Sequence, residues 1–354
     1  MSGMKQVLST PRVDECLFIT NSLQSFVHKE KPGHIPHNLS WQSISRILRQ
    51  QNLEPIFAEI YQDQALSYPI QQRWKQSRRT TWIRNTRAAV AAVRIFNLLE
   101  EEKISAVALR GLGLAHYLYR DISLRPCNDV DILIRQTDKE HLARVFLAQG
   151  WHLAKRNRSQ WVYYINDIKF EIHWSVLSPK RYQHLKLAKQ FIDSRKPLRM
   201  DEGEIYILDA ESEFIGLVLH AFLHHELEFM LPLVDLAILI RDNPLDWLFL
   251  SGWWQNAQLA TLFMFTCSLV SNLFALEMEI FKESKVSSEK FYNQFYHSYL
   301  DRFFGMDSIS NYILRKSMLF YSSEKLCLKI QQLIRLCSFD ELQDFLGCLK
   351  ETLC

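Results

Sequence analysis

The chain has 354 residues, of which 48% are hydrophobic and 23% are charged, and its net charge is +3. This is an ordinary globular balance, long enough for two domains with a core each, and the near-neutral charge does not by itself indicate a nucleic-acid-binding protein. The seven cysteines include no C-x-x-C pair, which argues against a disulfide framework or a zinc site.

The first hundred residues are predicted to be helical. Apolar residues recur at helical spacing in three segments, 17–27, 41–48 and 87–99. Between residues 64 and 99 the chain has seven basic residues and no acidic one. A helix with a solvated basic face is the plainer interpretation, and a surface for phosphates is the sharper one. We expect at least one of Arg84 and Arg87 to point toward a substrate cleft.

The pattern changes at Ile104 and becomes α+β. Short apolar segments predict strands at 104–109 and 129–134, with a glycine turn at 110–113 and a short helix at 114–119 between them. A helix follows, which Thr137 and Glu140 would cap and which ends at Gly150. Strands at 161–165 and 169–174 form a predicted hairpin around Asn166 and Asp167.

Helical patterns return after Pro179 and are predicted to continue to the end of the chain. Helices are expected at 211–228, which is rich in histidine, and at 231–241. The segment 247–276 has no charged residue, but its polar residues would be costly in lipid, so two buried helices are expected rather than a membrane span. Because the N-terminus also lacks the apolar segment of a signal peptide, a cytoplasmic protein is expected.

Three regions follow from these patterns. We predict a helical N-terminal region at 1–100, a core at 101–178 and a helical C-terminal domain at 179–354. The central motif of the core is the pair Asp129 and Asp131. Residues two apart on a strand point to the same face, so these carboxylates lie together while Val130 faces the interior.

A later strand carries a third carboxylate. Glu171 and His173 alternate in the same way, so they share one strand face. Adjacent carboxylates repel unless a cation lies between them, and magnesium is a hard ion that such ligands suit. Asp129, Asp131 and Glu171 are therefore predicted to hold two Mg²⁺ ions. The alternative is a pair of solvated aspartates on an exposed strand face.

The predicted site has two further consequences. Three negative charges in one small cleft should raise the pKa of at least one of the carboxyls when no metal is bound. Upstream, the turn at 110–113 joins a strand to a helix, and a glycine there allows backbone N–H groups to approach a phosphate.

This order of elements resembles the DNA polymerase β-like nucleotidyltransferases. From about residue 39 to about residue 262, the chain looks more closely like the bacterial "uncharacterised nucleotidyltransferase" family. The matching residues, most specific at 107–174, are Arg110-Gly111, Tyr119, Arg125, Asp129-Val-Asp131-Ile-Leu-Ile, Glu171-Ile-His173-Trp174, His220 to His225, Asp235-Leu236 and Asp246-Trp247. The resemblance implies an α+β fold, in which a small polymerase-β-like sheet is flanked by N-terminal and C-terminal helical regions.

The resemblance also implies an activity. Such a protein would move a nucleoside monophosphate from a nucleoside triphosphate to a hydroxyl acceptor, with two Mg²⁺ ions held by the catalytic residues Asp129, Asp131 and Glu171. The residues that it implies for nucleotide binding are Arg110, Gly111, Gly113, Arg125 and His173. The acceptor stays open between a protein, a peptide, an RNA and a small molecule.

Two departures from the family pattern keep other functions open. The turn Gly111-Leu112-Gly113 has no hydroxyl where the wider superfamily has Gly-Ser, and Arg110 replaces the usual Lys, although arginine can hold a phosphate bidentately. One alternative is therefore a nucleotide-binding module without catalysis. A second is a glycosyltransferase that uses the D-x-D pair to hold a metal and a nucleotide sugar, and the third carboxylate argues against it.

Three other groups have two interpretations each. Arg125 pairs either with the triphosphate or Asp129, or with the loop before the strand. His220 and His224 have the spacing of metal ligands on a helix, but hydrogen-bonded packing is preferred. Asp235 lies in an apolar run and is predicted to be buried and paired with a histidine or an arginine.

Overall fold

The computed structural model describes residues 13–280, with the exception of 65, 158, 178–184 and 225–228. The α-helices are α1 (Val13–His28), α2 (Trp41–Gln50), α3 (Glu54–Ile60), α4 (Tyr68–Glu101), α5 (Gly111–Leu114), α6 (Lys139–Ala148), α7 (Leu187–Asp193), α8 (Ala210–Leu219), α9 (Leu231–Asp242), α10 (Trp247–Asn256) and α11 (Ala260–Phe274). Two π-helical turns are η1 (Ala115–Tyr119) and η4 (His220–His224), and one 3-10 helical turn is η2 (Gln136–Asp138). The strands are β1 (Ala106–Leu109), β2 (Val130–Ile134), β3 (Leu153–Arg156), β4 (Gln160–Ile165), β5 (Ile168–His173), β6 (Lys196–Met200) and β7 (Gly203–Ile207).

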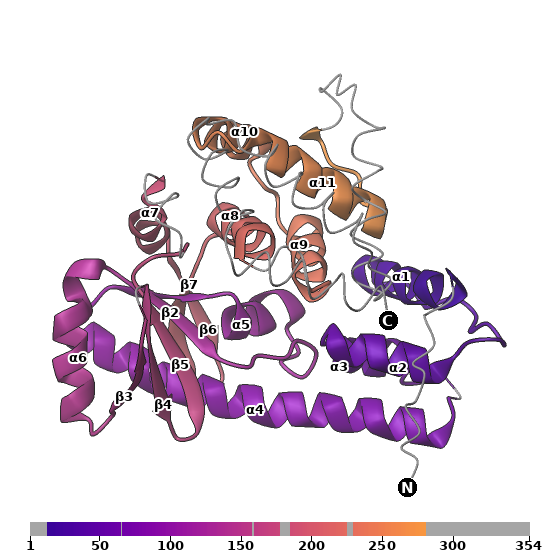
Figure 1. The fold of residues 1–354 in the computed structure, drawn as a ribbon, viewed down its shortest axis with the longest axis horizontal. Helices are drawn as coiled ribbons and strands as arrows, with labels where there is room; N and C mark the ends of the chain where they lie inside the picture. The colour runs from indigo at the N-terminus through magenta and orange to yellow at the C-terminus, as the bar shows by residue number, and fades with distance from the viewer. Residues whose placement is uncertain (1–12, 65, 158, 178–184, 225–228, 281–354) are drawn as a thin grey trace, which may run out of the picture.

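The strands form one mixed sheet, which helices flank, so the predicted α+β fold is confirmed (Figure 1). The order of the seven strands is β3-β4-β5-β2-β1-β7-β6. Strand β2 pairs antiparallel with β1 and parallel with β5. The predicted β4–β5 hairpin is present and turns at Asn166 and Asp167, which both have positive φ.

Alternating side chains of the central strands divide between two hydrophobic cores. Val130 and Ile132 belong to a core that also contains the alanine-rich part of α4 and Phe146 of α6. Leu133 belongs to the other core, which contains the C-terminal helices. Asp131 lies between Val130 and Ile132, so it shares the face of Leu133. The alternation therefore turns this carboxylate toward the C-terminal half of the chain.

Helix α4 connects the two halves of the molecule. Its 34 residues span about 50 Å and run beneath both the sheet and the N-terminal helices (Figure 1). The basic side chains of α4 are partly paired: Arg78 contacts Asp121 at 2.7 Å, and Arg84 donates to Asn128 Oδ1 at 2.7 Å. Arg87 donates to a backbone carbonyl in the β4–β5 turn. Arg84 and Arg87 both line a cleft that contains Asp129, which confirms the prediction for them.

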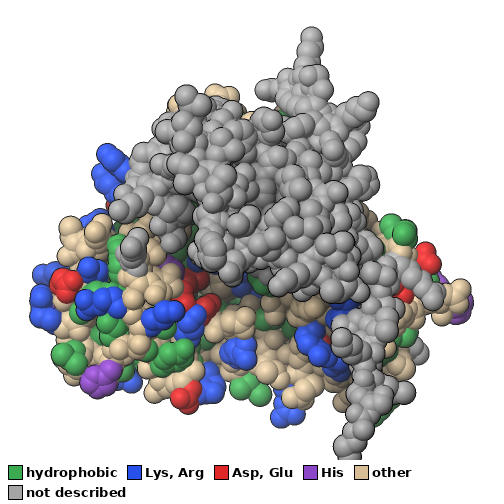
Figure 2. Space-filling model, viewed as in Figure 1, with side chains coloured by type: hydrophobic (Ala, Val, Ile, Leu, Met, Phe, Trp, Pro, Cys, Tyr) green, Lys and Arg blue, Asp and Glu red, His purple; other side chains and the backbone are tan. Residues whose placement is uncertain are grey.

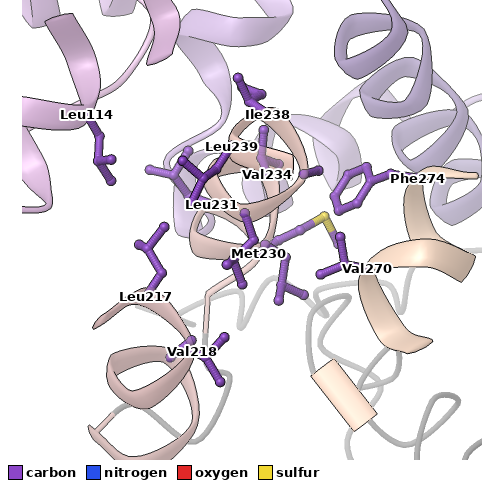
Figure 3. Packing of buried hydrophobic residues seen from close by; sticks show 14 of the residues in the cluster. Leu114, Leu217, Val218, Met230, Leu231, Val234, Ile238, Leu239, Val270 and Phe274 are labelled. Carbon is purple, nitrogen blue, oxygen red and sulfur yellow. The ribbon is translucent and has the colours of Figure 1, made fainter. Parts of the chain in front are cut away.

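The C-terminal helices pack around α9. Buried side chains of α8, α9 and α11 meet there, and Figure 3 labels Leu217, Val218, Val234, Val270 and Phe274 among them. The uncharged segment 247–276 forms α10 and α11, two separate helices as predicted. Within the described residues, no helix has the length and apolar character needed to cross a membrane.

Two predictions about secondary structure are wrong. Strands β6 and β7 lie where only helices were expected after Pro179. Thr137 does not cap α6, because its hydroxyl bonds the Asp138 carboxylate and Asp138 is the N-cap residue. The helix expected at 211–228 is present as α8, which continues without a break into the π-helical turn η4. The rest of that helix, 225–228, and the final segment, 281–354, lie outside the described residues.

Candidate functional site

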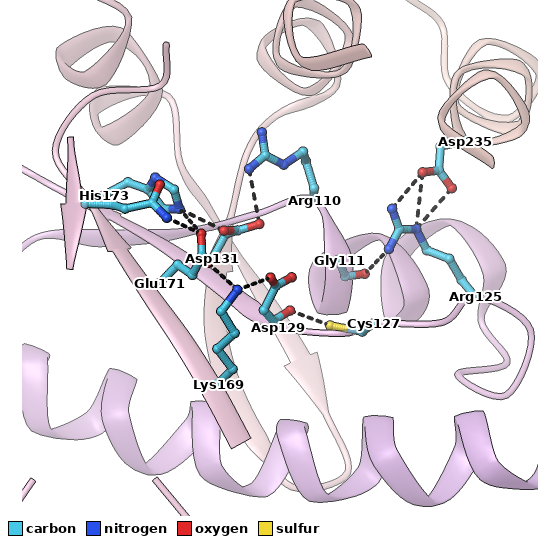
Figure 4. Close-up of polar contacts among 11 residues, drawn as sticks. Arg110, Gly111, Arg125, Cys127, Asp129, Asp131, Lys169, Glu171, His173 and Asp235 are labelled. Carbon is cyan, nitrogen blue, oxygen red and sulfur yellow. Dashed lines mark hydrogen bonds and ion pairs between the residues drawn. The ribbon is translucent and has the colours of Figure 1, made fainter. Parts of the chain in front are cut away.

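The carboxylates meet where β2 runs beside β5. The parallel register pairs Asp131 with Glu171, and the antiparallel register on the other side pairs Asp131 with Leu109, the last residue of β1. Arg110 follows directly and turns the chain with a φ of 52°. Its guanidinium contacts Asp131 Oδ2 at 3.1 Å, and His173 Nε2 lies 2.7 Å from Asp131 Oδ1 (Figure 4). Both oxygens of Asp131 are thus held by side chains of neighbouring strands.

Lys169 joins the remaining two carboxylates. Its ammonium group lies 3.2 Å from Asp129 Oδ2 and also contacts the Glu171 carboxylate (Figure 4). The other Glu171 oxygen accepts a hydrogen bond from Gln160 Nε2 at 2.5 Å. The three acidic residues therefore form one cluster with two cations, Arg110 and Lys169. Figure 2 shows acidic side chains next to basic ones at the surface over the sheet.

The pKa values of the two aspartates are shifted in opposite directions in this cluster. Burial raises the pKa of Asp129, and the neighbouring Asp131 charge raises it further, while Lys169 acts against both. Burial would also raise the pKa of Asp131, but Arg110 and His173, with a smaller effect of His220, outweigh it and hold that pKa well below its usual range. One carboxyl therefore has a raised pKa, as predicted, but burial contributes more to the shift of Asp129 than the charge crowding that the prediction gave as its cause.

A metal ion has a defined set of donors here. Among the described residues, the ligand atoms of Asp131, Glu171 and His173 all lie within 4.8 Å of one another. Asp129 is not one of these three residues, but its carboxylate lies beside them because it is ion-paired with Lys169. The sequence placed His173 with the nucleotide and Asp129 with the metal, so the geometry brings His173 closer to a metal position than expected.

The sequence matches the profile of a known protein family. The profile of the family described as "Uncharacterised nucleotidyltransferase" matches residues 37–275. The chain belongs to this family. The matched range includes all three carboxylates and both cations of the cluster. No protein among curated proteins matches the chain.

Three solved structures are similar in part of their fold. The solution structure of the antibiotic-resistance factor ANT(2″)-Ia has 8% identity and a TM-score of 0.36, and the match covers 53% of this chain and 97% of that one. A crystal structure of ANT(2″)-Ia in complex with adenylyl-2″-tobramycin has 9% identity and a TM-score of 0.35, over 48% and 95%. An antigenic nucleotidyltransferase-like protein from Paracoccidioides brasiliensis has 16% identity and a TM-score of 0.38, over 52% and 91%.

The two glycines in the turn of this nucleotidyltransferase-family chain have different structural roles. Gly111 has a φ of 36°, and a Cβ there would approach Cys127 Sγ at 3.2 Å and the Asp129 carbonyl at 3.4 Å. Its backbone thus lies against the segment that leads into the carboxylate strand. A Cβ on Gly113 would lie 2.9 Å from Ile207 on β7. Gly113 is therefore needed for packing of α5 on the sheet, although the sequence assigned it to the nucleotide.

Arg125 lies in a buried network rather than against the carboxylate cluster. Its guanidinium contacts Asp235 Oδ2 at 2.8 Å, and Tyr119 donates to the other Asp235 oxygen at 2.8 Å. Arg125 also donates to the Gly111 carbonyl, as Figure 4 shows. The Asp235 charge raises the pKa of Arg125 against the effect of burial. The structure thus favours the structural interpretation of Arg125 and confirms that Asp235 is buried and paired.

Sequence reasoning missed two residues near the cluster. Lys169 stands two positions before Glu171 on the same strand, so the alternation that selected Glu171 and His173 would also have found it. Glu213 on α8 is buried and lies close enough to Arg110 for their charges to interact. Nothing in its local sequence distinguishes Glu213 from an ordinary helical glutamate, because only tertiary packing brings α8 to this place.

Proposed function

We propose that this protein is a metal-dependent nucleotidyltransferase, which moves a nucleoside monophosphate from a nucleoside triphosphate to a hydroxyl group of an acceptor. The observation that carries the proposal is the cluster of Asp129, Asp131 and Glu171 at adjacent strands of a sheet in a nucleotidyltransferase-family chain. Such clusters favour phosphoryl transfer, because the reaction depends mainly on positioning and on neutralising phosphate charge.

The donor set fits magnesium. Carboxylate oxygens are the ligands that this hard ion prefers, and it is commonly held by one or two carboxylates together with substrate phosphates. Asp131 and Glu171, with His173 beside them, would hold one ion, and Asp129 would share a second ion with Asp131. Bound ions of this kind neutralise phosphate oxygens and lower the pKa of the attacking hydroxyl.

The chain supplies cations of its own around this position. Arg110 lies against Asp131 at the strand end, where its remaining N–H groups can hold a phosphate in the bidentate manner of guanidinium groups. Lys169 offers a compact charge on the other side of the cluster. The backbone at Gly111 approaches the same place, so it would contact the triphosphate. Glu171 would accept the proton of the acceptor hydroxyl while the α-phosphorus is attacked in line and pyrophosphate leaves.

A labelling experiment tests this function. The protein is incubated with magnesium, each α-³²P-labelled nucleoside triphosphate and pooled protein, peptide, RNA and small-molecule acceptors. We expect the label to enter one acceptor pool while pyrophosphate is released, and we expect Asp131→Asn to abolish the transfer. Binding of a nucleotide with no transfer to any pool would instead support the non-catalytic nucleotide-binding module. Transfer of sugar from a nucleotide sugar, with no label from the α-phosphate, would support the glycosyltransferase.

A further inference from the structure

A cleft opens between α4 and the β4–β5 hairpin, beside the carboxylate cluster. We call it the α4 cleft, and its volume is about 570 Å³. The residues that line it are Thr80, Ile83, Arg84, Arg87, Ala88, Cys127, Asn128, Asp129, Val130, Tyr164, Asp167, Ile168 and Lys169. This volume lies in the usual range for small-molecule sites, roughly 300 to 1,000 Å³. The volume of the cleft therefore suits one small molecule rather than a folded protein or RNA domain.

Positive charge predominates on the wall that α4 contributes. Arg84 and Arg87 are exposed and stand three residues apart, so their side chains leave the same face of the helix. Arg84 donates to the Asn128 side chain at 2.7 Å, and Arg87 donates to the Asn166 carbonyl at 3.1 Å and lies 4.0 Å from the exposed carboxylate of Asp167. A guanidinium has five N–H donors, so both retain capacity for an anion. Lys169 on the opposite wall is already ion-paired with Asp129, so the two arginines are the cations of the cleft that an anion would meet first.

The same cleft has an apolar part. Ile83 is 43% exposed and Tyr164 is 59% exposed, and both line the α4 cleft. Tyr164 pairs with Lys169 across the β4–β5 hairpin, so their side chains leave the same face of the hairpin. An occupant with a negative group and a carbon skeleton would satisfy both parts of the lining.

The α4 cleft reaches the catalytic cluster at one side only. Among the described residues, its lining includes Asp129 and Lys169 but not Arg110 or Gly111, which the proposed function assigns to the nucleotide. In an in-line transfer, the attacking hydroxyl and the leaving pyrophosphate lie on opposite sides of the α-phosphorus. The nucleotide would thus occupy the side of Arg110, and the α4 cleft is left for the second reactant.

We propose that the α4 cleft is the acceptor site and that the acceptor is a small anionic hydroxyl compound, whose phosphate or carboxylate is bound by Arg84 and Arg87. This inference rests on the proposed function, because only a protein that transfers a nucleoside monophosphate has an acceptor. The hydroxyl end of the molecule would lie toward Asp129, and the charged end would lie toward α4. An uncharged or cationic acceptor would leave both guanidinium groups without the partner that the cleft provides for.

Binding measurements with small probes test the proposal without any need for turnover. The probes are matched by skeleton: glucose 6-phosphate, gluconate and glucose form one set, and glycerol 3-phosphate and glycerol form another. Dissociation constants are measured by ligand-observed NMR for wild type, Arg84→Gln and Arg87→Gln. The control is Arg79→Gln, an exposed arginine of the same helix that does not line the cleft. The dissociation constant of ATP with magnesium is measured on each protein.

We expect the anionic probes to bind at least about tenfold more tightly than their neutral partners. Arg84→Gln and Arg87→Gln should each weaken them by about tenfold, while Arg79→Gln and the affinity for ATP stay within about twofold of wild type. The comparison of glucose 6-phosphate with gluconate separates a phosphate from a carboxylate as the recognised group.

Three results would overturn the proposal: no anionic probe binding better than its neutral partner, an equal loss in Arg79→Gln, or an equal loss of ATP affinity in the cleft variants. A short oligoribonucleotide that binds the α4 cleft in preference to every small anion would also overturn it. Failure of the proposed function has a separate signature, because wild type would then transfer no label from any α-³²P-labelled nucleoside triphosphate, whatever the probes do.

Discussion

Glu213 is buried beside the candidate site without a full set of partners. It is 3% exposed, and within the described residues its Oε1 atom has no hydrogen-bond partner. Burial raises the pKa of Glu213 from 4.5 to about 7, with Arg110 acting to lower it and Asp235 acting to raise it. The folded protein therefore holds a proton on Glu213 in a pH range where the unfolded chain releases it.

This difference makes stability depend on pH in a defined direction. Below pH 4.5 Glu213 is protonated in both states, so its contribution is fully present. As the pH rises to 7, the unfolded chain gains the free energy of ionisation and the folded protein does not, so stability falls. The two pKa values differ by about 2.5, which corresponds to a loss of about 3 kcal/mol at most. Above pH 7 no further change is expected from this residue.

The substitution Glu213→Gln removes the titrating group and keeps the shape. At pH 8 the variant should be more stable than wild type by about 2 kcal/mol, and at pH 5 the two should agree within about 1 kcal/mol. Urea unfolding of both proteins at pH 5, 6, 7 and 8 measures the difference. Glu101 on α4 is exposed, so Glu101→Gln serves as the control. Its free energy of unfolding should differ from that of wild type by less than about 0.5 kcal/mol at every pH. Stability curves of Glu213→Gln and wild type that run parallel from pH 5 to 8 would refute this reasoning.

Three further substitutions test the contacts of the cluster and of the buried ion pair. Lys169→Met removes the cation between two carboxylates, so the variant should melt below wild type in chelator and gain more from added Mg²⁺; an equal gain in both proteins would contradict this. Asp131→Asn leaves Arg110 with a neutral partner, so urea unfolding in chelator should show a loss of about 1 to 2 kcal/mol, and unchanged stability would show that repulsion outweighs the ion pairs. Arg125→Met leaves Asp235 buried and unpaired, so it should cost about 3 to 5 kcal/mol in the same assay, and a cost below about 1 kcal/mol would remove the structural role.

The alternation of side chains along the strands was the sequence pattern that predicted the residues of the site best. It identified the strand face shared by Glu171 and His173 and the turn of Asp131 away from Val130 and Ile132, because the two-residue period of a strand is independent of tertiary context. Asp129 was predicted on the same strand as Asp131 but lies just before β2, which begins at Val130. The alternation did not indicate that β2 and β5 would be parallel neighbours, which is what brings Asp131 next to Glu171. That adjacency depends on strand order, and strand order is fixed by packing over the whole chain.

The elements that sequence reasoning missed have identifiable physical causes. Strand β6 contains Pro197 and lies at the edge of the sheet, where a proline costs no ladder hydrogen bond and exposed polar residues hide the strand pattern. Arg125 stayed open between a nucleotide role and a structural role, and Asp235 was predicted to pair with a histidine or an arginine. The two could not be matched from the sequence, because Arg125 and Asp235 are 110 residues apart and only tertiary packing brings them together.

Titration of nucleotides with and without magnesium tests the central claim most directly. Wild type and Asp131→Asn are each titrated calorimetrically with ATP, GTP, CTP and UTP, once in Mg²⁺ and once in chelator. We expect wild type to bind at least one of the four in Mg²⁺ and to bind it much more weakly in chelator, and we expect Asp131→Asn to lose this dependence on metal. Wild type that is indifferent to every metal–nucleotide pair, or an Asp131→Asn variant that keeps the full magnesium-dependent affinity, would contradict the assignment of a metal–nucleotide site to this cluster.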